Sequence, residues 1–362
     1  MRYKIETWTI EKLLDTFNND RLNLNPPYQR NDIWTEKAQI DLIFTIKKGL
    51  PIPNFFLHEQ ANGYDIADGQ QRTRALLQYR NGEITDGMKN KYAKERDFLD
   101  YKLSVQIIDS NVTESEIMEF YVKVNRSGLK LNSSELRKAD RFESRILAVL
   151  EDITQSYEFK SLNIFTSKQQ DRMIDREFVE ELATFLLFGI QDKKEAAIKK
   201  LYGTEITLSD EDLSKMKSNF KNTLSIINTL GESFNFSKSR YSQRNDFYTV
   251  FQFIHENYQL GFEFFKKCFD VLFKIEPDIK PSNDRCEPFQ DYALHCVSQS
   301  NSKKAREHRI YFLNQLLLNK SSEPNNIQKL ILKYYDVGIE NGMIQNSGFF
   351  ILNPEALVSK FI

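Results

Sequence analysis

The stretch Asp68-Gly69-Gln70-Gln71-Arg72 stands between a segment with the pattern of a β-strand and one with the pattern of a helix. Before it, residues 54–58 and 64–67 have the composition of β-strands and flank an Asn62-Gly63 turn, which predicts a β-hairpin. After it, residues 70–79 carry apolar side chains at helical spacing. Gly69 permits the tight turn that is needed between the strand and the helix. This strand-to-helix junction decides the expected fold of the first part of the chain.

The first turn of the expected helix has the composition of an anion site. Backbone N–H groups there have no partner within the helix, and the helix dipole favours negative charge. Arg72 and Arg74 add positive charge. Gln70 and Gln71 are long amides where a small capping residue is usual, and they suit contacts to a ligand or to metal-bound water. Alternatively, Asp68 merely caps the helix and both arginines are solvated, because so short a string is a weak signal alone.

Two further polar segments, residues 26–30 and 125–128, could also contribute to the anion site. The prolines of residues 26–30 hold that stretch extended before Trp34, so that it can lie beside the strand-to-helix junction. The alternative is that Tyr28 and Trp34 are core anchors and that Arg30 is a surface ion-pair partner. Residues 125–128 join two expected helices, and their glycine can take a positive φ. The alternative for these residues is a plain helix-to-helix turn.

The two parts of the chain differ in their periodicity. Strand-like and helix-like segments alternate up to residue 145, whereas the rest has helical periodicity at 143–153, 173–189, 210–230, 246–274, 303–319 and 325–336. We therefore expect an α+β domain with a small mixed sheet over residues 1–145 and an all-α helical domain over residues 146–362. We interpret the many phenylalanines of the second part as the core of a helix bundle.

The composition is that of an ordinary globular protein. With 40% hydrophobic and 28% charged residues and a net charge of −1, the chain is not of the disordered class and shows no global sign of nucleic-acid binding. The first residues carry charge where a secretory signal needs an apolar core, and no apolar stretch reaches the ~20 residues of a spanning helix. We expect a cytoplasmic protein without membrane contact. Three cysteines fit a reducing compartment.

The three motifs, in their order, resemble the N-terminal domain of GmrSD- and SspE-type restriction and phage-defence proteins. The resemblance is carried by residues 26–34, 66–73 and 120–137, covers about residues 8–145, and continues faintly over residues 171–178. It implies a ParB/sulfiredoxin-like fold in which two arginine-bearing segments surround a nucleotide. It also implies binding or hydrolysis of a nucleoside triphosphate, and recognition of modified phage DNA.

The resemblance and the chemistry of the residues together imply a role for each position. Arg30 and Arg72 would neutralise phosphates, and Asp68 would hold Mg²⁺ through water or orient the attacking water. The expected catalytic residues are Asp68, Gln70, Gln71 and Arg72, with Asp68 also the metal ligand. The expected nucleotide-binding residues are Tyr28, Gln29, Arg30, Gly69, Arg74, Asn125, Ser127 and Gly128.

The C-terminal region departs from the pattern of that family, in which a His-Asn-His nuclease domain on the same chain or on a partner cuts the DNA. Such a nuclease needs histidines near an acidic residue on a compact ββα unit. Only His295 and His308 are available, in helix-like segments and without an Asp-His pair. His295, Cys296 and Cys286 lack the paired spacing of a metal site. We therefore expect no nuclease domain of this type, and a nuclease partner protein where DNA is cut.

Three functions remain open. The first is a nucleotide-binding, triphosphate-hydrolysing (GTP or ATP) component of a phage-defence or modification-dependent restriction system, whose helical domain binds a partner or DNA. The second is a nuclease or nickase in which Asp65, Asp68 and Glu59 bind a metal. The third is a non-catalytic sensor of nucleotide or DNA phosphate that acts through a partner. The sequence leaves the nucleotide, the DNA modification and the oligomeric state open.

Overall fold

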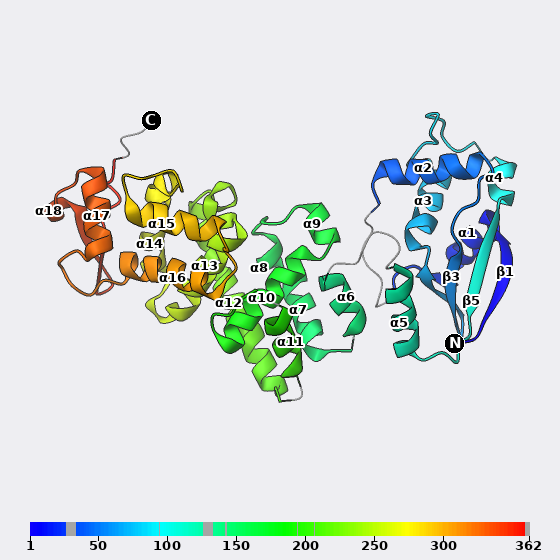
Figure 1. Ribbon diagram of the computed structural model, residues 1–362, viewed down its shortest axis with the longest axis horizontal. Coiled ribbons are helices and arrows are strands. Elements are labelled where there is room, and N and C mark those ends of the chain that lie inside the picture. Colours follow the sequence, from blue (N-terminus) through cyan, green and yellow to red (C-terminus); the bar gives the residue numbers. More distant parts are fainter. Residues whose placement is uncertain are drawn as a thin grey trace. The chain divides into compact units, whose positions relative to one another are not determined.

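The computed structural model describes residues 1–26, 34–93, 95–125, 133–141, 143–193, 195–205 and 207–358. These residues form two compact units (Figure 1). The first consists of residues 1–143 and 167–174, and the second of residues 144–166 and of the chain from Asp175 onwards. The sequence predicted a domain boundary after residue 145. The units instead divide after Glu143, and the first also takes in a segment that the prediction assigned to the helical domain.

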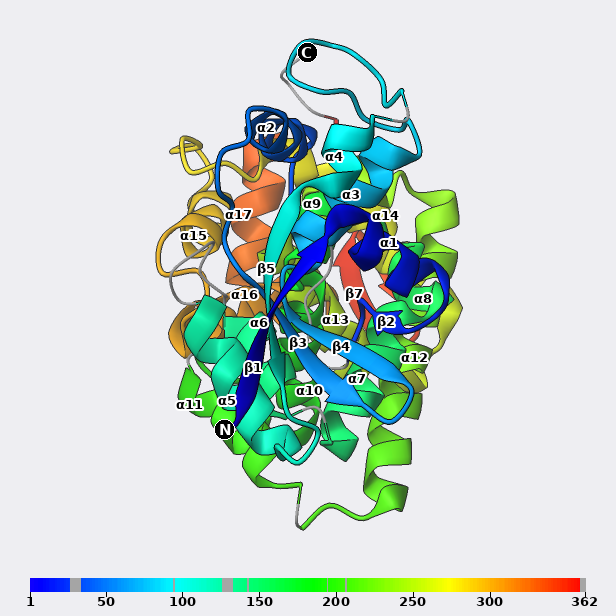
Figure 2. The same ribbon diagram turned by 90° about the vertical axis from the view of Figure 1, so that its right-hand side faces the viewer.

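The first unit is built on a five-stranded mixed sheet with the strand order β1-β5-β3-β4-β2 (Figure 2). β1 runs antiparallel to β5 and β3 antiparallel to β4, whereas β3 with β5 and β2 with β4 are parallel pairs. This mixed sheet confirms the α+β prediction for the N-terminal part. The strands are β1 (Tyr3–Thr9), β2 (Leu22–Asn23), β3 (Phe55–Gln60), β4 (Gly63–Asp68) and β5 (Lys102–Ile108).

Helices cover both faces of this sheet, so that neighbouring residues of β3 enter different cores. Phe55 and Leu57 are fully buried in a core shared with α1, α2 and α3, while Phe56 packs against Phe120 of α5. This alternation is the pattern of a strand buried on both faces. The helices of the unit are α1 (Ile10–Asn18), α2 (Glu36–Lys47), α3 (Gln70–Arg80), α4 (Arg96–Asp100), α5 (Glu114–Asn125), α6 (Ser133–Asp140) and α9 (Ser167–Asp171).

The junction between β4 and α3 contains a bulge followed by a left-handed glycine. Asp68 pairs with Phe56 while Ile66 pairs with the next residue of β3, so Ala67 is the extra residue of a bulge. Gly69 then has φ +110° and is the N-cap of α3. A Cβ at Gly69 would lie 2.5 Å from Cδ1 of Phe55, well inside van der Waals contact. Both the backbone angle and the contact with Phe55 therefore require glycine.

The second unit is largely helical. Its α-helices are α7 (Arg145–Gln155), α8 (Tyr157–Lys160), α10 (Ile174–Phe188), α11 (Glu195–Gly203), α12 (Asp210–Ser233), α13 (Arg244–Glu256), α14 (Phe262–Ile275), α15 (Glu287–Val297), α16 (Lys303–Leu317), α17 (Asn326–Tyr335) and α18 (Ile339–Gly342). Short 3-10 helices lie at Phe236–Lys238, Arg240–Ser242, Tyr258–Leu260 and Glu276–Asp278. Among the helices of the described ranges, none is long and apolar enough to cross a bilayer.

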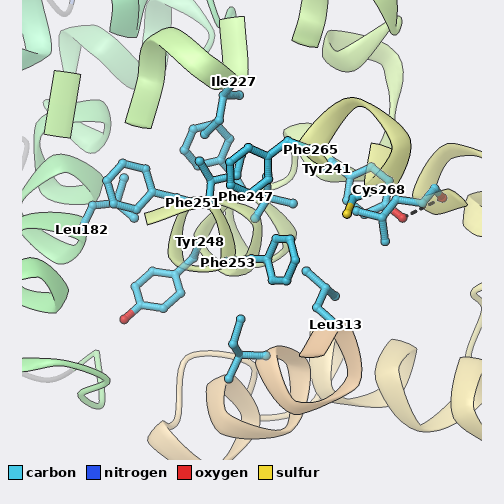
Figure 3. Close-up of a cluster of buried hydrophobic side chains, with 14 of the residues drawn as sticks. Leu182, Ile227, Tyr241, Phe247, Tyr248, Phe251, Phe253, Phe265, Cys268 and Leu313 are labelled. Carbon is cyan, nitrogen blue, oxygen red and sulfur yellow. Dashed lines mark hydrogen bonds between the residues drawn. The ribbon is translucent and has the colours of Figure 1, made fainter. Parts of the chain in front are cut away.

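Phe247, Phe251 and Phe253 of α13 lie in a cluster of buried hydrophobic side chains (Figure 3). Phe251 packs against Phe220 of α12, and Phe253 packs against Phe265 of α14. All four rings are at most 1% exposed. The interpretation of the phenylalanines as bundle core is therefore confirmed for these side chains, each of which contributes about 1.5–3 kcal/mol by its burial.

Two details of the second unit differ from the prediction. The helical stretch expected over 246–274 is two helices, because Gly261 has φ +80° and ends the turn between them. The unit is also not all-α, since β6 (Met343–Asn346) and β7 (Phe349–Leu352) form a hairpin. Its two turn residues, Ser347 and Gly348, both have positive φ, as type I′ turns require. The strands are too short to show a clear period of two in the sequence.

Lys47 at the end of α2 forms ion pairs with two carboxylates of the segment that follows α3. Its Nζ lies 2.8 Å from Oδ2 of Asp86 and 3.0 Å from Oε2 of Glu95. The backbone amides of Met88 and Asn90 donate to the other oxygen of Asp86, at 2.9 and 2.8 Å. Burial raises the pKa of Asp86, but the bonds from Lys47 and Asn90 outweigh it and lower this pKa to about 2.

We expect Gly69→Ala to lower the free energy of unfolding of the first unit by about 2–4 kcal/mol, because it adds backbone strain and an overlap with Phe55. Gly82→Ala is the matched control: its φ is +74° but no atom lies within 4 Å of a Cβ there, so the cost should be about 1 kcal/mol. The chain's two tryptophans, Trp8 and Trp34, both belong to the first unit, so tryptophan fluorescence during urea unfolding measures this unit alone. Equal losses of unfolding free energy in the two variants would contradict the conclusion that the contact with Phe55 requires glycine at position 69.

The lowered pKa of Asp86 makes the first unit sensitive to acid. A carboxyl group whose pKa is lower in the folded state contributes stability above its unfolded pKa, and this contribution disappears as the pH falls through the folded value. The difference in unfolding free energy between the native protein and Asp86→Asn should therefore shrink as the pH falls from about 4 to about 2. Urea titrations followed by tryptophan fluorescence measure it, with the exposed Asp97→Asn as control. A difference that does not change over this range would contradict the prediction.

Candidate functional site

The guanidinium of Arg72 lies inside the first unit and is bonded to protein groups. The side chain is 8% exposed, and its Nη2 lies 2.6 Å from Oδ2 of Asp68. Nη2 also donates to the carbonyl of Asn54 at 3.0 Å, and Nη1 donates to the carbonyl of Pro53. Its Cζ lies 4.5 Å from the centre of the Phe55 ring. Burial lowers the pKa of Arg72, and the neighbouring Asp68 carboxylate acts in the opposite direction.

These contacts place the end of β4, the approach to β3 and the start of α3 around one charged group. Arg72 was expected to neutralise a phosphate, whereas here its guanidinium donates to two carbonyls and to a carboxylate. The side chain of Asp68 is 28% exposed, so the carboxylate is the part of this ion pair that solvent reaches. The sequence pattern gave no sign of Pro53 and Asn54 as partners, because they lie 19 and 18 residues before Arg72.

Gln70 and Gln71 join α3 to the segment that precedes α2. The Nε2 of Gln70 donates to the carbonyl of Leu24 at 2.6 Å, and Oε1 of Gln71 accepts from the backbone N–H of Trp34 at 3.1 Å. The two side-chain amides are also bonded to each other, at 3.2 Å. Both glutamines are buried. They therefore bind the chain on either side of residues 27–33.

Several of the expected site residues lie outside the described part of the chain. Tyr28, Gln29 and Arg30 fall within residues 27–33, and Ser127 and Gly128 fall within residues 126–132. Asn125 is the last residue of α5, and its side chain is not among those described. The roles expected at these positions stay predictions.

The first turn of α3 begins on a residue without a side chain. Gly69 is the N-cap, and the first bond of the helix runs from the amide of Thr73 to the Gly69 carbonyl at 2.8 Å. The alternative in which Asp68 caps the helix is therefore wrong, since Asp68 pairs with Arg72 instead. Arg74 is half-buried beside this turn, and its Nη2 donates to Oδ1 of Asn25 at 2.5 Å.

The carboxylates expected to hold a metal in a nuclease do not come together. Asp65 accepts from Asn23 at 2.8 Å and from Gln60 at 3.0 Å. Glu59 pairs with Tyr64, the neighbour of Asp65 on β4, so it projects from the other face of the sheet. Within the described ranges, no group of three metal-binding side chains forms around Asp65 and Asp68. The three-carboxylate site of the second hypothesis is therefore not present.

We expect Arg72→Met to lower the free energy of unfolding of the first unit by about 3–5 kcal/mol, because a partly buried carboxylate and two carbonyls lose their donor. Arg80→Met on the same helix should cost about 1 kcal/mol or less, since its pair with Asp15 is partly exposed and 3.5 Å long. Tryptophan fluorescence during urea unfolding compares the two. A loss in Arg72→Met no larger than in Arg80→Met would show that this guanidinium does not organise the junction.

Comparison with known proteins identifies the region around this junction. Residues 10–105 match a family model described as the GmrSD restriction endonuclease, N-terminal domain. The match begins at α1, ends within β5 and includes the whole Asp68–Arg72 stretch, whereas residues 120–137 of the third motif lie beyond it. No curated protein and no solved structure matches the chain. The resemblance found in the sequence is thus confirmed for this domain.

Proposed function

We propose that this chain, which carries the N-terminal domain of the GmrSD restriction endonuclease family over residues 10–105, is the nucleotide-binding and triphosphate-hydrolysing component of a restriction system. The observation that best supports this is the start of α3, where a helix N-terminus without a side-chain cap stands beside the carboxylate of Asp68. Such a helix start favours phosphate through its backbone N–H groups and its dipole.

In this proposal Arg72 is a positioning residue. Its N–H groups donate to Pro53, Asn54 and Asp68, so it acts on the nucleotide through the carboxylate that it holds. The positive charge that meets phosphate then comes from Arg74, which lies beside the first turn of α3, and from Arg30. This division of roles replaces the direct phosphate contact expected of Arg72 from the sequence.

Gln70 and Gln71 are also positioning residues in this proposal. Because they bind Leu24 and Trp34, they hold both flanks of the segment that contains Tyr28, Gln29 and Arg30 against the start of α3. We assign them to placing that polar segment, and Gly69 to letting the backbone amides approach the phosphates. Asn125, Ser127 and Gly128 are proposed to contact the nucleotide from the segment after α5.

Asp68 fits the way in which proteins hold Mg²⁺ with nucleotides. That ion keeps several waters and is bound through one or two carboxylates together with the substrate's phosphates. One partly exposed carboxylate beside an anion-binding helix start meets this requirement. When bound, the ion would neutralise phosphate charge. Hydrolysis would form a bond from water oxygen to the γ-phosphorus and break the bond to the bridging oxygen, which leaves on the nucleoside diphosphate.

The second unit is proposed to bind a partner protein or DNA. Its described residues form a helical body with a phenylalanine core and one hairpin. In this arrangement a separate protein supplies the nuclease, and the nucleotide bound by the first unit controls it.

The test compares hydrolysis of radiolabelled ATP and GTP, with Mg²⁺, by the native chain, Asp68→Asn and Asp65→Asn. Asp68→Asn keeps an oxygen that accepts from Arg72 but loses the charge that holds the ion, so we expect turnover to fall at least ~100-fold. Asp65→Asn is the matched control, because Asp65 lies on the same strand and is bonded to Asn23 and Gln60. Its turnover should stay within about twofold of the native value.

Circular dichroism and tryptophan fluorescence establish that each variant is folded. Equal turnover in all three proteins would rule out this site as catalytic. Calorimetric binding of nucleotide without turnover would select the sensor hypothesis. Nicking of supercoiled plasmid that is lost in Asp68→Asn, in the absence of nucleotide hydrolysis, would select the nuclease.

A further inference from the structure

Two histidines and an aspartate come together in the second unit, where α15 packs against α16. Asp291 and His295 are four residues apart on α15 and therefore share one face of that helix, while His308 belongs to α16. Nδ1 of His295 lies 3.5 Å from Oδ1 of Asp291, and Nδ1 of His308 lies 3.9 Å from Oδ2 of the same carboxylate. The imidazole rings are stacked, with centroids 4.2 Å apart. One ligand atom from each residue lies within 4.8 Å of the others.

We propose that Asp291, His295 and His308 bind a divalent transition-metal ion, with Zn²⁺ as the ion that fits best. Two imidazole nitrogens and one carboxylate oxygen form a donor set that Zn²⁺ accepts in proteins. Mg²⁺ and Ca²⁺ prefer oxygen ligands throughout, so this cluster discriminates against them. Across the described part of the chain, no other three side chains of His, Cys, Asp or Glu bring their ligand atoms so close.

A hydrogen bond between the His295 ring and the backbone of Asp291 supports this assignment. Its Nδ1 lies 2.9 Å from the carbonyl oxygen of Asp291, to which an Nδ1–H can donate. A histidine that binds a metal usually donates its other ring N–H to a carbonyl or carboxylate, and this bond fixes the tautomer. When Nδ1 carries the proton for this bond, Nε2 is the ring nitrogen of His295 that is left to bind a metal.

A buried arginine holds the two helices in register for the metal. Arg309 directly follows His308 in the sequence and is 1% exposed. Its Nη1 donates to the carbonyls of His295 and Ser300, at 2.7 and 2.8 Å, and its Nε donates to Oγ1 of Thr249 at 3.0 Å. The backbone at one ligand is therefore bonded to the neighbour of another. The helices can therefore stay in place when a metal binds, whereas the two stacked imidazole rings have to rotate so that a nitrogen of each points at the ion.

The cluster is accessible to solvent. The side chains of Asp291 and His308 are 56% and 43% exposed, and that of His295 is 23% exposed. Three protein ligands on such a surface leave a fourth position for water or for a group from a partner. Both ligand-bearing elements are helices, so the cluster is not the ββα site of a His-Asn-His nuclease.

The sequence grouped His295 with the wrong neighbours. Cys296 and Cys286 are its nearest cysteines in the sequence, and their spacing did not predict a metal site; in the structure Sγ of Cys296 lies 3.7 Å from Oδ1 of the buried Asp246. Burial raises the pKa of Cys296 to about 12. Asp291 and His295 are one helical turn apart and form an Asp–His pair in this region, contrary to the expectation from the sequence.

The test is a titration of the full chain, freed of metal by a chelator, with Zn²⁺ in a calorimeter and with Co²⁺ by visible absorption. The native chain should bind one ion at this cluster, with a Co²⁺ spectrum that excess Mg²⁺ does not remove. His308→Ala and Asp291→Asn should each weaken Zn²⁺ binding at least ~10-fold and change that spectrum. Zn²⁺ should also raise the melting temperature of the native chain, since the ion binds only the folded state.

Glu307→Gln is the matched control, because Glu307 is exposed, adjoins His308 and pairs with Lys303 outside the cluster. It should bind Zn²⁺ as the native chain does. Absence of binding by the native chain would overturn the proposal. The same affinity and Co²⁺ spectrum in native chain, His308→Ala and Asp291→Asn would also overturn it. Because ATP and GTP hydrolysis depends on Asp68 of the other unit, neither result affects the proposed nucleotide site.

Discussion

A guanidinium inside a protein must have hydrogen-bond acceptors around it, because an unpaired buried charge is far more costly than the fold can tolerate. Arg72 satisfies this constraint with Asp68 and with the carbonyls of Pro53 and Asn54. The approach to β3, the end of β4 and the first turn of α3 therefore meet at one point. Gly69 is needed at the same place, because a Cβ there would collide with the Phe55 ring beneath the guanidinium.

The arrangement of the candidate site follows from this one ion pair. Arg72 is directed into the protein, so the Asp68 carboxylate is the part of the ion pair that solvent reaches, and Arg74 lies half-buried beside the first turn of α3. Buried amides of Gln70 and Gln71 then attach the chain at Leu24 and Trp34 to the same helix. The helix start proposed to bind phosphate and the carboxylate proposed to hold the metal are thereby placed side by side without a glycine-rich phosphate loop.

Buried arginines fix helix ends in the second unit by the same physical means. Arg306 pairs with Glu181 and donates to the carbonyl of Gln191 at 3.0 Å, and Arg309 donates to the carbonyl of His295. Such groups add little net stability, but they accept few alternative packings because each lost partner is costly. The phenylalanine core supplies the stabilising burial, while the arginines set the register. The proposed metal cluster depends on that register, since its ligands come from two helices.

The sequence by itself determined the strand-to-helix junction at Gly69, the mixed sheet, the largely helical second part and the family of the N-terminal domain. Each of these features is predicted by a local sequence pattern, namely strand alternation, helical periodicity, turn residues or a short motif. Only the tertiary structure decided that Arg72 faces Pro53 and Asn54, that Gln70 and Gln71 bind Leu24 and Trp34, and that His308 of α16 joins Asp291 and His295 of α15. These partners lie on different elements, and the direction of a side chain between elements depends on how they pack, which no local pattern records.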